Sequence, residues 1–354
     1  MGVKHQAVQW NGNKIVYDLF ILAALAAFVG VFMAVGLQTR PNGHQADAVV
    51  LLIRALGSAA FLMLTITLTI GPLARFSPRF LPLLYNRRHL GVMTFLVAAA
   101  HFALATFWYH AGGPLNPFVS IFVSNPLYDS VEGFPFEIFG LGALAILYLM
   151  AATSHDFWLK NLSASVWKLL HMLVYVAYGL LVLHIAFGAL MTEKADIYVA
   201  LVVAALALVA GLHILAGLRE WTRDSGMKGL HAPEGWIDVC APDDIPDKRA
   251  VIAPLPKGDR VAVFRDGAKI YAVQNACRHQ NGPLGEGCIK DGTITCPWHG
   301  WQYRPQDGVS PPPFEERIAT HDVRLSSLGR VFVRVDRNRL GKHGAFIDLE
   351  RARP

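Results

Sequence analysis

The sequence predicts a multidomain protein in which an all-α bundle of six transmembrane helices (residues 1–230) precedes an all-β domain (residues 231–354). Composition gives the first reason. Hydrophobic residues make up 53% of the chain and charged residues only 16%, which is typical of a membrane protein with a soluble appendage. The second reason is position, since long apolar runs stop near residue 230 and short strand-like runs separated by turn residues come after it.

Six apolar runs are long enough to cross a bilayer as helices, which takes about 20 residues each. They cover residues 15–37, 49–71, 89–106, 134–153, 166–190 and 197–218, and the third is the shortest. The first run could be mistaken for a secretory signal, but its apolar stretch is too long, so we interpret it as a retained helix.

Lysine and arginine residues beside these runs indicate the orientation. Eleven of them flank one set of helix ends: Lys4, Lys14, Arg75, Arg79, Arg87, Arg88, Lys160, Lys168, Arg219, Arg223 and Lys228. Only Arg40 and Lys194 flank the other set. By the positive-inside rule, the N- and C-termini are predicted to be cytoplasmic in a bacterial inner (plasma) membrane. The net charge of +6 is thus mostly topogenic and implies no nucleic-acid partner.

The all-β domain contains two pairs of potential iron ligands. Cys277 and His279 form the first pair, and Cys296 and His299 form the second after sixteen intervening residues. In a Rieske 2Fe-2S centre, two cysteines hold one iron and two histidines hold the other. The alternative is a zinc site, but structural zinc motifs usually pair cysteine with cysteine and histidine with histidine. The order Cys, His, Cys, His therefore predicts a Rieske cluster.

Each ligand loop is predicted to come directly after a strand, at residues 269–275 and 293–295, with Asp-Gly turns at residues 266–267 and 291–292. Residues 233–340 resemble Rieske ferredoxins and the Rieske modules of ring-hydroxylating oxygenases. Three stretches carry the resemblance: Cys277-Arg278-His279-Gln280, Gly282-Pro283-Leu284 and Cys296-Pro297-Trp298-His299-Gly300-Trp301.

The respiratory type of Rieske protein differs in two ways. It has a disulfide that clamps the ligand loops and a serine that bonds a cluster sulfur, whereas Gly282, Trp298 and Trp301 stand at these positions here. Tyr303 could still supply a hydroxyl. The resemblance implies a potential towards the negative end of the Rieske range. Cys240 and Cys288 are predicted to be inert thiols in a reducing compartment.

Ionisable residues in membrane helices are candidates for function, and five histidines qualify: His89, His101, His171, His184 and His213. His101 lies thirteen residues beyond Arg88 and His184 sixteen beyond Lys168, which places them about 20 and 24 Å into outward-running helices. A lone histidine is often only a hydrogen-bonded core residue. Two at a shared depth, however, can bind a b-type haem between them.

A second haem nearer the cytoplasmic side is a further possibility. His171 shares its level with His89 and, more loosely, with His213. Thirteen residues separate His171 from His184, which leaves their side chains about 140° apart on a regular helix, so both face one way only if the helix bulges. The alternative is that His171 binds a haem propionate or caps the bundle.

Residues 50–190 also resemble the ferric reductase-like transmembrane domain family. The matching stretches are Arg87-Arg88-His89-Leu90-Gly91 leading to His101, and residues 167–175 leading to His184. The resemblance implies that one haem is held by His101 and His184. Ferric reductases and NADPH oxidases of this family append a flavin and nicotinamide module, but the chain has no dinucleotide fingerprint. In the order of the sequence, a Rieske domain stands in the place of that module.

These features predict an oxidoreductase of electron transport. A cytosolic donor, such as a ferredoxin reductase, would reduce the 2Fe-2S cluster, and the electron would pass through haem b to an unknown periplasmic or membrane acceptor. No residue is predicted to act as an acid, base or nucleophile. Two alternatives remain: a terminal reductase of ferric chelates, oxygen or quinone, and a redox sensor that uses the Rieske cluster alone and needs no haem.

Overall fold

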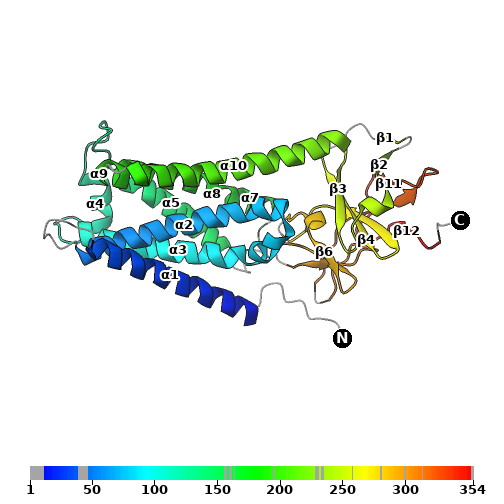
Figure 1. Ribbon diagram of the computed structural model, residues 1–354, viewed down its shortest axis with the longest axis horizontal. Coiled ribbons are helices and arrows are strands. Elements are labelled where there is room, and N and C mark those ends of the chain that lie inside the picture. The colour runs from blue at the N-terminus through cyan, green and yellow to red at the C-terminus, as the bar shows by residue number, and fades with distance from the viewer. Residues whose placement is uncertain are drawn as a thin grey trace.

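The computed structural model describes residues 12–38, 47–154, 158, 162, 164–193, 196–227, 231–232, 235–256, 258–279, 281–298, 300–312 and 314–351. His299 and the predicted domain boundary at residue 230 lie outside these ranges. The molecule is elongated, with helices running along its long axis and a β domain at one end (Figure 1). The order predicted from the sequence, helices first and strands second, is confirmed.

The long helices are α1 (Gly12–Gln38), α2 (Ala48–Phe76), α3 (Leu81–His110), α5 (Glu137–Thr153), α7 (Ala164–Met172), α8 (Val174–Ile185) and α10 (Asp196–Met227). Short turns of helix join them: η1 (Pro78–Phe80), α4 (Pro117–Val123), the π-helical η2 (Ala186–Leu190) and α9 (Met191–Glu193). Within the described ranges, five helical segments are long and apolar enough to cross a membrane. The remaining predicted run forms α5, an apolar helix of 17 residues.

The third helix is much longer than its apolar run. The run covers residues 89–106 and is the shortest of the six, whereas α3 extends over 30 residues and α5 over 17. The reason is that α3 begins at Leu81, before Arg87 and Arg88, so the helix continues through charged residues that end the apolar run.

Helix α2 lies in the middle of the bundle and packs against α1, α3 and α10, while α5 packs against α8. Two apolar clusters fill the bundle. One joins α1, α2 and α3 through residues such as Ile21, Ile70 and Leu90. The other joins α2, α5, α8 and α10 through residues such as Leu64 and Ala177. Many apolar side chains on the outside are exposed, as expected for helices that face lipid.

The fifth predicted run is not one regular helix. It is interrupted at Leu173, between α7 and α8, and passes into the π-helical η2 directly after Ile185. A π-turn inserts an extra residue into the helical repeat and rotates the residues after it. The break at Leu173 lies between His171 and His184, so the angle expected for a regular helix does not apply to them.

The β domain contains three sheets. A four-stranded sheet has the order β1-β2-β11-β10, a second has the order β12-β5-β4-β3 with β9 also paired to β5, and a three-stranded sheet has the order β6-β7-β8. The strands are β1 (His231–Ala232), β2 (Trp236–Cys240), β3 (Ala250–Pro254), β4 (Arg260–Asp266), β5 (Lys269–Gln274), β6 (Cys288–Lys290), β7 (Thr293–Thr295), β8 (Gln302–Tyr303), β9 (Thr320–His321), β10 (Val323–Leu325), β11 (Val331–Arg334) and β12 (Ile347–Asp348). Every pair between these strands is antiparallel.

The two strands predicted to precede the ligand loops are confirmed as β5 and β7. The hairpin between β6 and β7 turns at Asp291 and Gly292, both with positive φ (50° and 73°), as a type I′ turn requires. The hairpin between β4 and β5 is shifted by one residue from the prediction. Asp266 pairs with Lys269, so its turn consists of residues 267–268.

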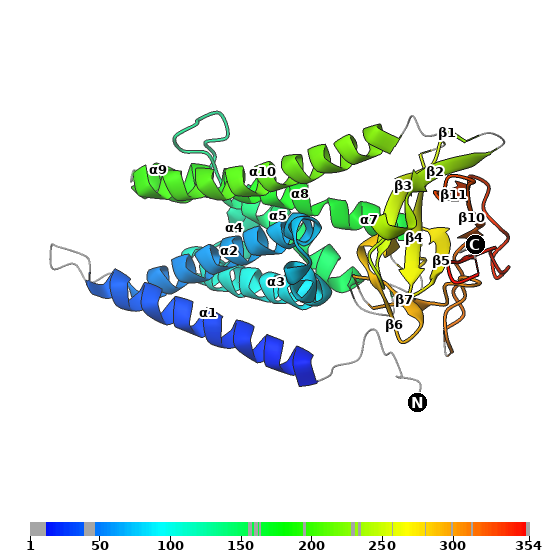
Figure 2. The same cartoon turned by 45° about the vertical axis from the view of Figure 1, so that its right-hand side comes forward.

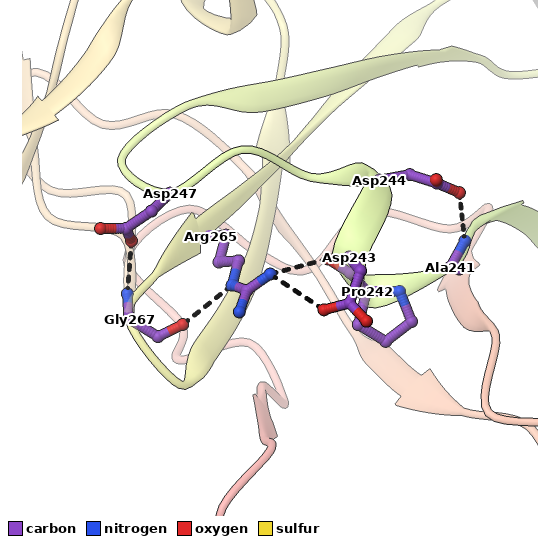
Figure 3. Close-up of polar contacts among 7 residues, drawn as sticks. All are labelled: Ala241, Pro242, Asp243, Asp244, Asp247, Arg265 and Gly267. Carbon is purple, nitrogen blue, oxygen red and sulfur yellow. Dashed lines mark hydrogen bonds and ion pairs between the residues drawn. The ribbon is translucent and has the colours of Figure 1, made fainter.

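Arg265 fastens this second turn to the segment after β2 (Figure 3). Its Nε donates to the carbonyl of Gly267 at 3.0 Å, and its Nη1 donates to the carbonyl of Pro242 at 3.2 Å. The backbone N–H of Gly267 in turn donates to Asp247 at 2.8 Å, and this bond lowers the pKa of that carboxyl group. The hairpin that leads to the first ligand loop is thus held at its far end.

The β domain lies against the ends of the helices where α3 begins and α2 and α10 end (Figure 2). Arg75 at the end of α2 is 3.5 Å from Glu286, which comes after the first ligand loop. Glu220 in α10 accepts a hydrogen bond from Arg260 at the start of β4, at 2.8 Å. The cation-rich end of the bundle is therefore the end that contacts the β domain.

Candidate functional site

His101 on α3 and His184 on α8 face each other inside the bundle. Their ring centres lie 6.3 Å apart and their planes are 85° apart. A metal–imidazole bond is about 2 Å and the ring centre lies roughly 1 Å behind its nitrogen, so two imidazoles on one iron have ring centres about 6 Å apart. The observed separation fits one iron between the two rings.

Hydrogen bonds fix the tautomer of both rings. His101 Nδ1 lies 2.9 Å from the carbonyl oxygen of Ile53, and His184 Nδ1 lies 3.0 Å from that of Phe136. A carbonyl oxygen can only accept, so Nδ1 carries the proton in each ring. The Nε2 lone pair is then left for a metal, which is the arrangement that backbone carbonyls impose on metal-ligating histidines. The two residues fit the axial positions of a b-type haem.

Each ring also rests on a glycine of a neighbouring helix. A Cβ atom on Gly57 of α2 would lie 3.0 Å from His101 Cε1, and one on Gly140 of α5 would lie 2.8 Å from His184 Nδ1. Each glycine comes four residues after the carbonyl that its histidine bonds. The two histidines are therefore held in the same way. In each case a backbone carbonyl accepts from the ring, and a glycine one helical turn later leaves room for it.

The histidines nearer the β domain have different partners. His89 Nδ1 lies 3.0 Å from a carboxylate oxygen of Asp18 on α1. His171 stacks on Trp167 with ring centres 3.6 Å apart, its Nδ1 donates to the carbonyl of Trp167, and its Nε2 lies 3.4 Å from Ser154 Oγ. Neighbouring protein groups thus hold both rings in place. An inner haem at these histidines stays a prediction.

His213 is also engaged. Its Nδ1 donates to the carbonyl of Val209 at 2.8 Å, and its Nε2 lies 3.0 Å from the hydroxyl of Tyr175. Because Nδ1 carries the proton, Nε2 accepts from that hydroxyl. His213 therefore already uses both ring nitrogens within the protein.

The two predicted cluster loops in the β domain close in the same way. The N–H of Cys277 donates to the carbonyl of Gly282 (2.9 Å), and its carbonyl accepts from the N–H of Asn281 (2.7 Å). The second loop repeats both bonds at the same spacing, with Cys296, Trp301 (2.7 Å) and Gly300 (2.9 Å). The fifth residue of each loop has positive φ, 61° at Asn281 and 69° at Gly300. Both loops thus have one backbone design, although their sequences differ.

Three of the four predicted cluster ligands are described. Cys277 and Cys296 are each 2% exposed, and His279 stacks on Trp301 with ring centres 4.3 Å apart. No group of three or more potential ligands for a single ion occurs among the described side chains. A Rieske cluster does not need one, because each iron takes only two protein ligands. Two buried cysteines and a stacked histidine on matching loops fit the cluster.

Tyr303 places a hydroxyl beside the cluster loops, where the sequence analysis named it as a possible substitute for the serine of respiratory Rieske proteins. Its side chain is fully buried, and its oxygen accepts from the N–H of Arg278 at 3.0 Å and lies 3.3 Å from Cys277 Sγ. Burial, together with the neighbouring Cys277, raises the pKa of Tyr303, so the phenol keeps its proton. If Cys277 binds iron as a thiolate, it has no proton to give, and Tyr303 would then donate to the sulfur.

Gly282 and Trp298 stand where respiratory Rieske proteins have the two cysteines of their disulfide, and the two residues face each other here. A Cβ atom on Gly282 would lie 2.9 Å from Cys296 Sγ and 3.1 Å from the indole of Trp298. The structure contains no disulfide at Cys240 or Cys288, the two cysteines predicted to be thiols. Burial raises the pKa of the Cys240 thiol to about 12, with a smaller contribution from Asp244.

Sequence reasoning missed Gly57, Gly140 and Asp18. Small residues mark close contacts between membrane helices, so glycines within two apolar runs were the available signal for the first two. Asp18 is an acidic residue inside the first apolar run, and such residues are expected to have a partner.

Comparisons with known proteins give two family matches. Residues 235–322 match the Rieske [2Fe-2S] domain, and residues 56–182 match the ferric reductase like transmembrane component. Ferredoxin CarAc of Metapseudomonas resinovorans is 32% identical over 105 residues, which cover 28% of this chain and 92% of the ferredoxin.

Two further relatives match different shares of this chain. The protein-methionine-sulfoxide reductase heme-binding subunit MsrQ of Polaromonas naphthalenivorans (strain CJ2) is 28% identical over 176 residues, covering 50% of this chain and 74% of that subunit. The terminal oxygenase component CarAa of carbazole 1,9a-dioxygenase from Sphingomonas sp is 35% identical over 75 residues, 21% of this chain. The match spans only 20% of that oxygenase.

Proposed function

Because the chain belongs to the Rieske [2Fe-2S] domain family through residues 235–322 and to the ferric reductase like transmembrane components through residues 56–182, we propose that it is a membrane electron conduit. It takes single electrons from a cytosolic donor, such as a ferredoxin reductase, and delivers them across the bundle to a periplasmic or membrane acceptor. A bound Rieske cluster and a bound haem b each supply one-electron redox chemistry.

One observation carries the proposal most directly: His101 and His184 face each other with ring centres 6.3 Å apart. Both present Nε2, because Nδ1 is held by a backbone carbonyl. If His101 and His184 both hold the iron of a haem, no coordination position would be left for a substrate, and the haem would supply electron transfer only. The likeness to a heme-binding subunit supports the same assignment.

The cluster ligands in this proposal are Cys277, His279, Cys296 and His299. The protein buries the sulfurs, orients His279 against Trp301 and donates a hydrogen bond from Tyr303. Burial and hydrogen bonds to sulfur are the means by which a protein adjusts the potential of such a cluster. No side chain has to move a proton.

We also propose that all six predicted runs cross the bacterial inner membrane, α5 included, with both termini in the cytosol. Seventeen residues of α5 span about 25 Å, close to the thickness of the hydrocarbon core of about 30 Å. In this orientation the β domain is cytosolic, where a soluble donor reaches it.

A second haem between the inner histidines is the less supported part of the proposal. His89 and His171 are the candidates, and Asp18 holds His89 through Nδ1 as a carboxylate holds a metal-ligating histidine. The number of haems bound per protein molecule decides whether this second haem exists. His89→Ala and His171→Ala lower the haem content only if an inner haem exists.

The test of the conduit is stepwise reduction of the purified full-length protein. We expect a Rieske EPR signal with average g below 2, a low-spin haem spectrum, and haem reduction that depends on the cluster. The matched control is Cys277→Ser, which removes the cluster and should abolish haem reduction by the same donor. Protein with a full Rieske cluster but no haem, from cells supplied with haem precursor, would leave the sensor hypothesis instead.

A further inference from the structure

Trp298 lies where the second ligand loop meets the helical bundle. It is two residues after Cys296 and directly before His299, and its indole covers Gly282 of the first ligand loop. The same side chain packs against the apolar cluster of α1, α2 and α3, which includes Leu84 and Leu90. Trp298 therefore contacts both ligand loops and the inner end of the bundle.

Arg87 on α3 faces this indole. Its guanidinium carbon lies 5.6 Å from the centre of the Trp298 ring, within the range of a cation–π contact. Arg87 is two residues before His89 on α3. The residue that meets the cluster loop therefore lies within one turn of an inner histidine on the same helix.

Two ion pairs also join the bundle to the β domain. Arg75 of α2 is 3.5 Å from Glu286, and Glu220 of α10 is 2.8 Å from Arg260. In the first pair the bundle supplies the cation, and in the second the β domain supplies it. Such crossed charges select one docking orientation, because a rotated domain would oppose like charges.

We infer that the Rieske domain docks on its own bundle with its ligand loops foremost, and that the contact between Trp298 and Arg87 is where an electron leaves the cluster for the bundle. The inference rests on the proposed conduit. In this step the reduced cluster loses one electron and a ferric haem gains it, and no proton or bond is exchanged at the contact.

The ion pairs are partly exposed, with side-chain exposures of 43% and 21% for Arg75 and Glu286. Pairs of this kind are weak and screened by salt. The docked state is therefore expected to be sensitive to ionic strength and to reversal of a single charge. A charge swap can then separate docking from cofactor binding, because the residues of both ion pairs lie outside the ligand loops.

The experiment measures the rate of haem reduction after a photochemical reductant has reduced the cluster of the full-length protein. The variants are Arg75→Glu, Glu286→Arg and the double variant, with Arg79→Glu as a matched reversal on an exposed arginine of the same bundle end. Each single reversal should slow the step about fivefold at low salt, while the double variant should recover to within about twofold of the wild-type rate. Arg79→Glu should keep the wild-type rate, and EPR and haem spectra should be unchanged in all four.

Trp298→Leu tests the contact itself and should slow the same step with both cofactors still bound. If that variant loses its cluster, the charge swap between Arg75 and Glu286 still tests the docking. Single reversals at the wild-type rate, or a double variant no faster than the slower single variant, would overturn the docking.

A second measurement does not depend on electron transfer. A zero-length carbodiimide should join Glu220 to position 260 in Arg260→Lys protein, and mass spectrometry identifies the cross-linked peptide. If wild-type haem is never reduced through the cluster but this cross-link forms, the conduit fails and the docking stands. If the cross-link is absent while the cluster still reduces the haem, the docking fails and the conduit stands.

Discussion

The imidazoles of His101 and His184 are held with ring centres 6.3 Å apart, each by a carbonyl of a different helix. Because those carbonyls come from α2 and from Phe136, the N-cap residue directly before α5, four helices converge on one site. The separation of the two imidazoles is therefore set by the packing of the bundle. If they hold a haem as proposed, changes at the supporting residues should be visible in the haem spectrum.

Replacing either axial histidine should remove the haem spectrum. In His101→Ala or His184→Ala protein, one imidazole remains in a site built for two, so the iron becomes five-coordinate or the haem is lost. Absorption spectra of purified protein check this. His110→Ala is the control, since His110 bonds Ser120 at the far end of α3. An unchanged low-spin spectrum in either variant would contradict the assignment, and the Rieske signal should persist in all three.

The two glycines beneath the rings should not tolerate a methyl group. Gly57→Ala and Gly140→Ala place a carbon 3.0 and 2.8 Å from ring atoms, an overlap that costs about 1–3 kcal/mol. We expect reduced haem occupancy or a shifted spectrum. Gly91→Ala and Gly179→Ala on α3 and α8 are matched controls, because nothing lies within 4 Å of a Cβ atom there. Equal haem content in all four variants would show that the glycines do not position the ligands.

Tyr303→Phe should lower the potential of the cluster. The hydroxyl 3.3 Å from Cys277 Sγ stabilises the more negative, reduced cluster. Losing one hydrogen bond of about 1 kcal/mol corresponds to about 40 mV for one electron. Potentiometric titration monitored by EPR measures the shift, and Tyr271→Phe in β5 is the control. A potential that is unchanged or higher in Tyr303→Phe protein would refute the bond.

Cys240 should be inert in the folded protein. Burial raises the pKa of its thiol to about 12, so the reactive thiolate is scarce at any pH below that value and increases as the pH approaches it. Iodoacetamide at about pH 8, where an ordinary thiol with a pKa of about 8.5 reacts, should leave Cys240 unmodified until the protein is denatured. Peptide mass spectrometry detects the adduct. Modification of Cys240 in the native protein would mean that the thiol is accessible.

The orientation is testable with a reporter fused after Pro354. The excess of lysine and arginine at the helix ends beside the β domain predicts that only a cytosolic reporter is active there. Green fluorescent protein should fluoresce and alkaline phosphatase should be inactive. The opposite pattern would reverse the proposed direction of electron flow.

Local sequence was enough to predict several parts of this protein. Ligand identity depends on residue type and spacing, so Cys277, His279, Cys296 and His299 could be singled out, and the strands before both loops were found from β-prone residues and Asp-Gly turns. His101 and His184 could be paired by depth alone, because the rise per residue of a helix is constant. Helix ends were less predictable. Helix α3 continues through Arg87 and Arg88, because a helix can extend beyond the edge of the lipid.

Other features depended on how distant segments pack. The sequence by itself determined which residues can hold iron and which segments belong in lipid, because ligand chemistry and hydropathy are properties of short stretches. Only the tertiary structure decided that Ile53 and Phe136 fix the histidine tautomers, that Gly57 and Gly140 make room for the rings, and that Trp298 meets Arg87. Each of these contacts joins residues more than 40 positions apart in the chain. No local pattern encodes such a contact, since it exists only when helices and sheet pack at one particular distance and rotation.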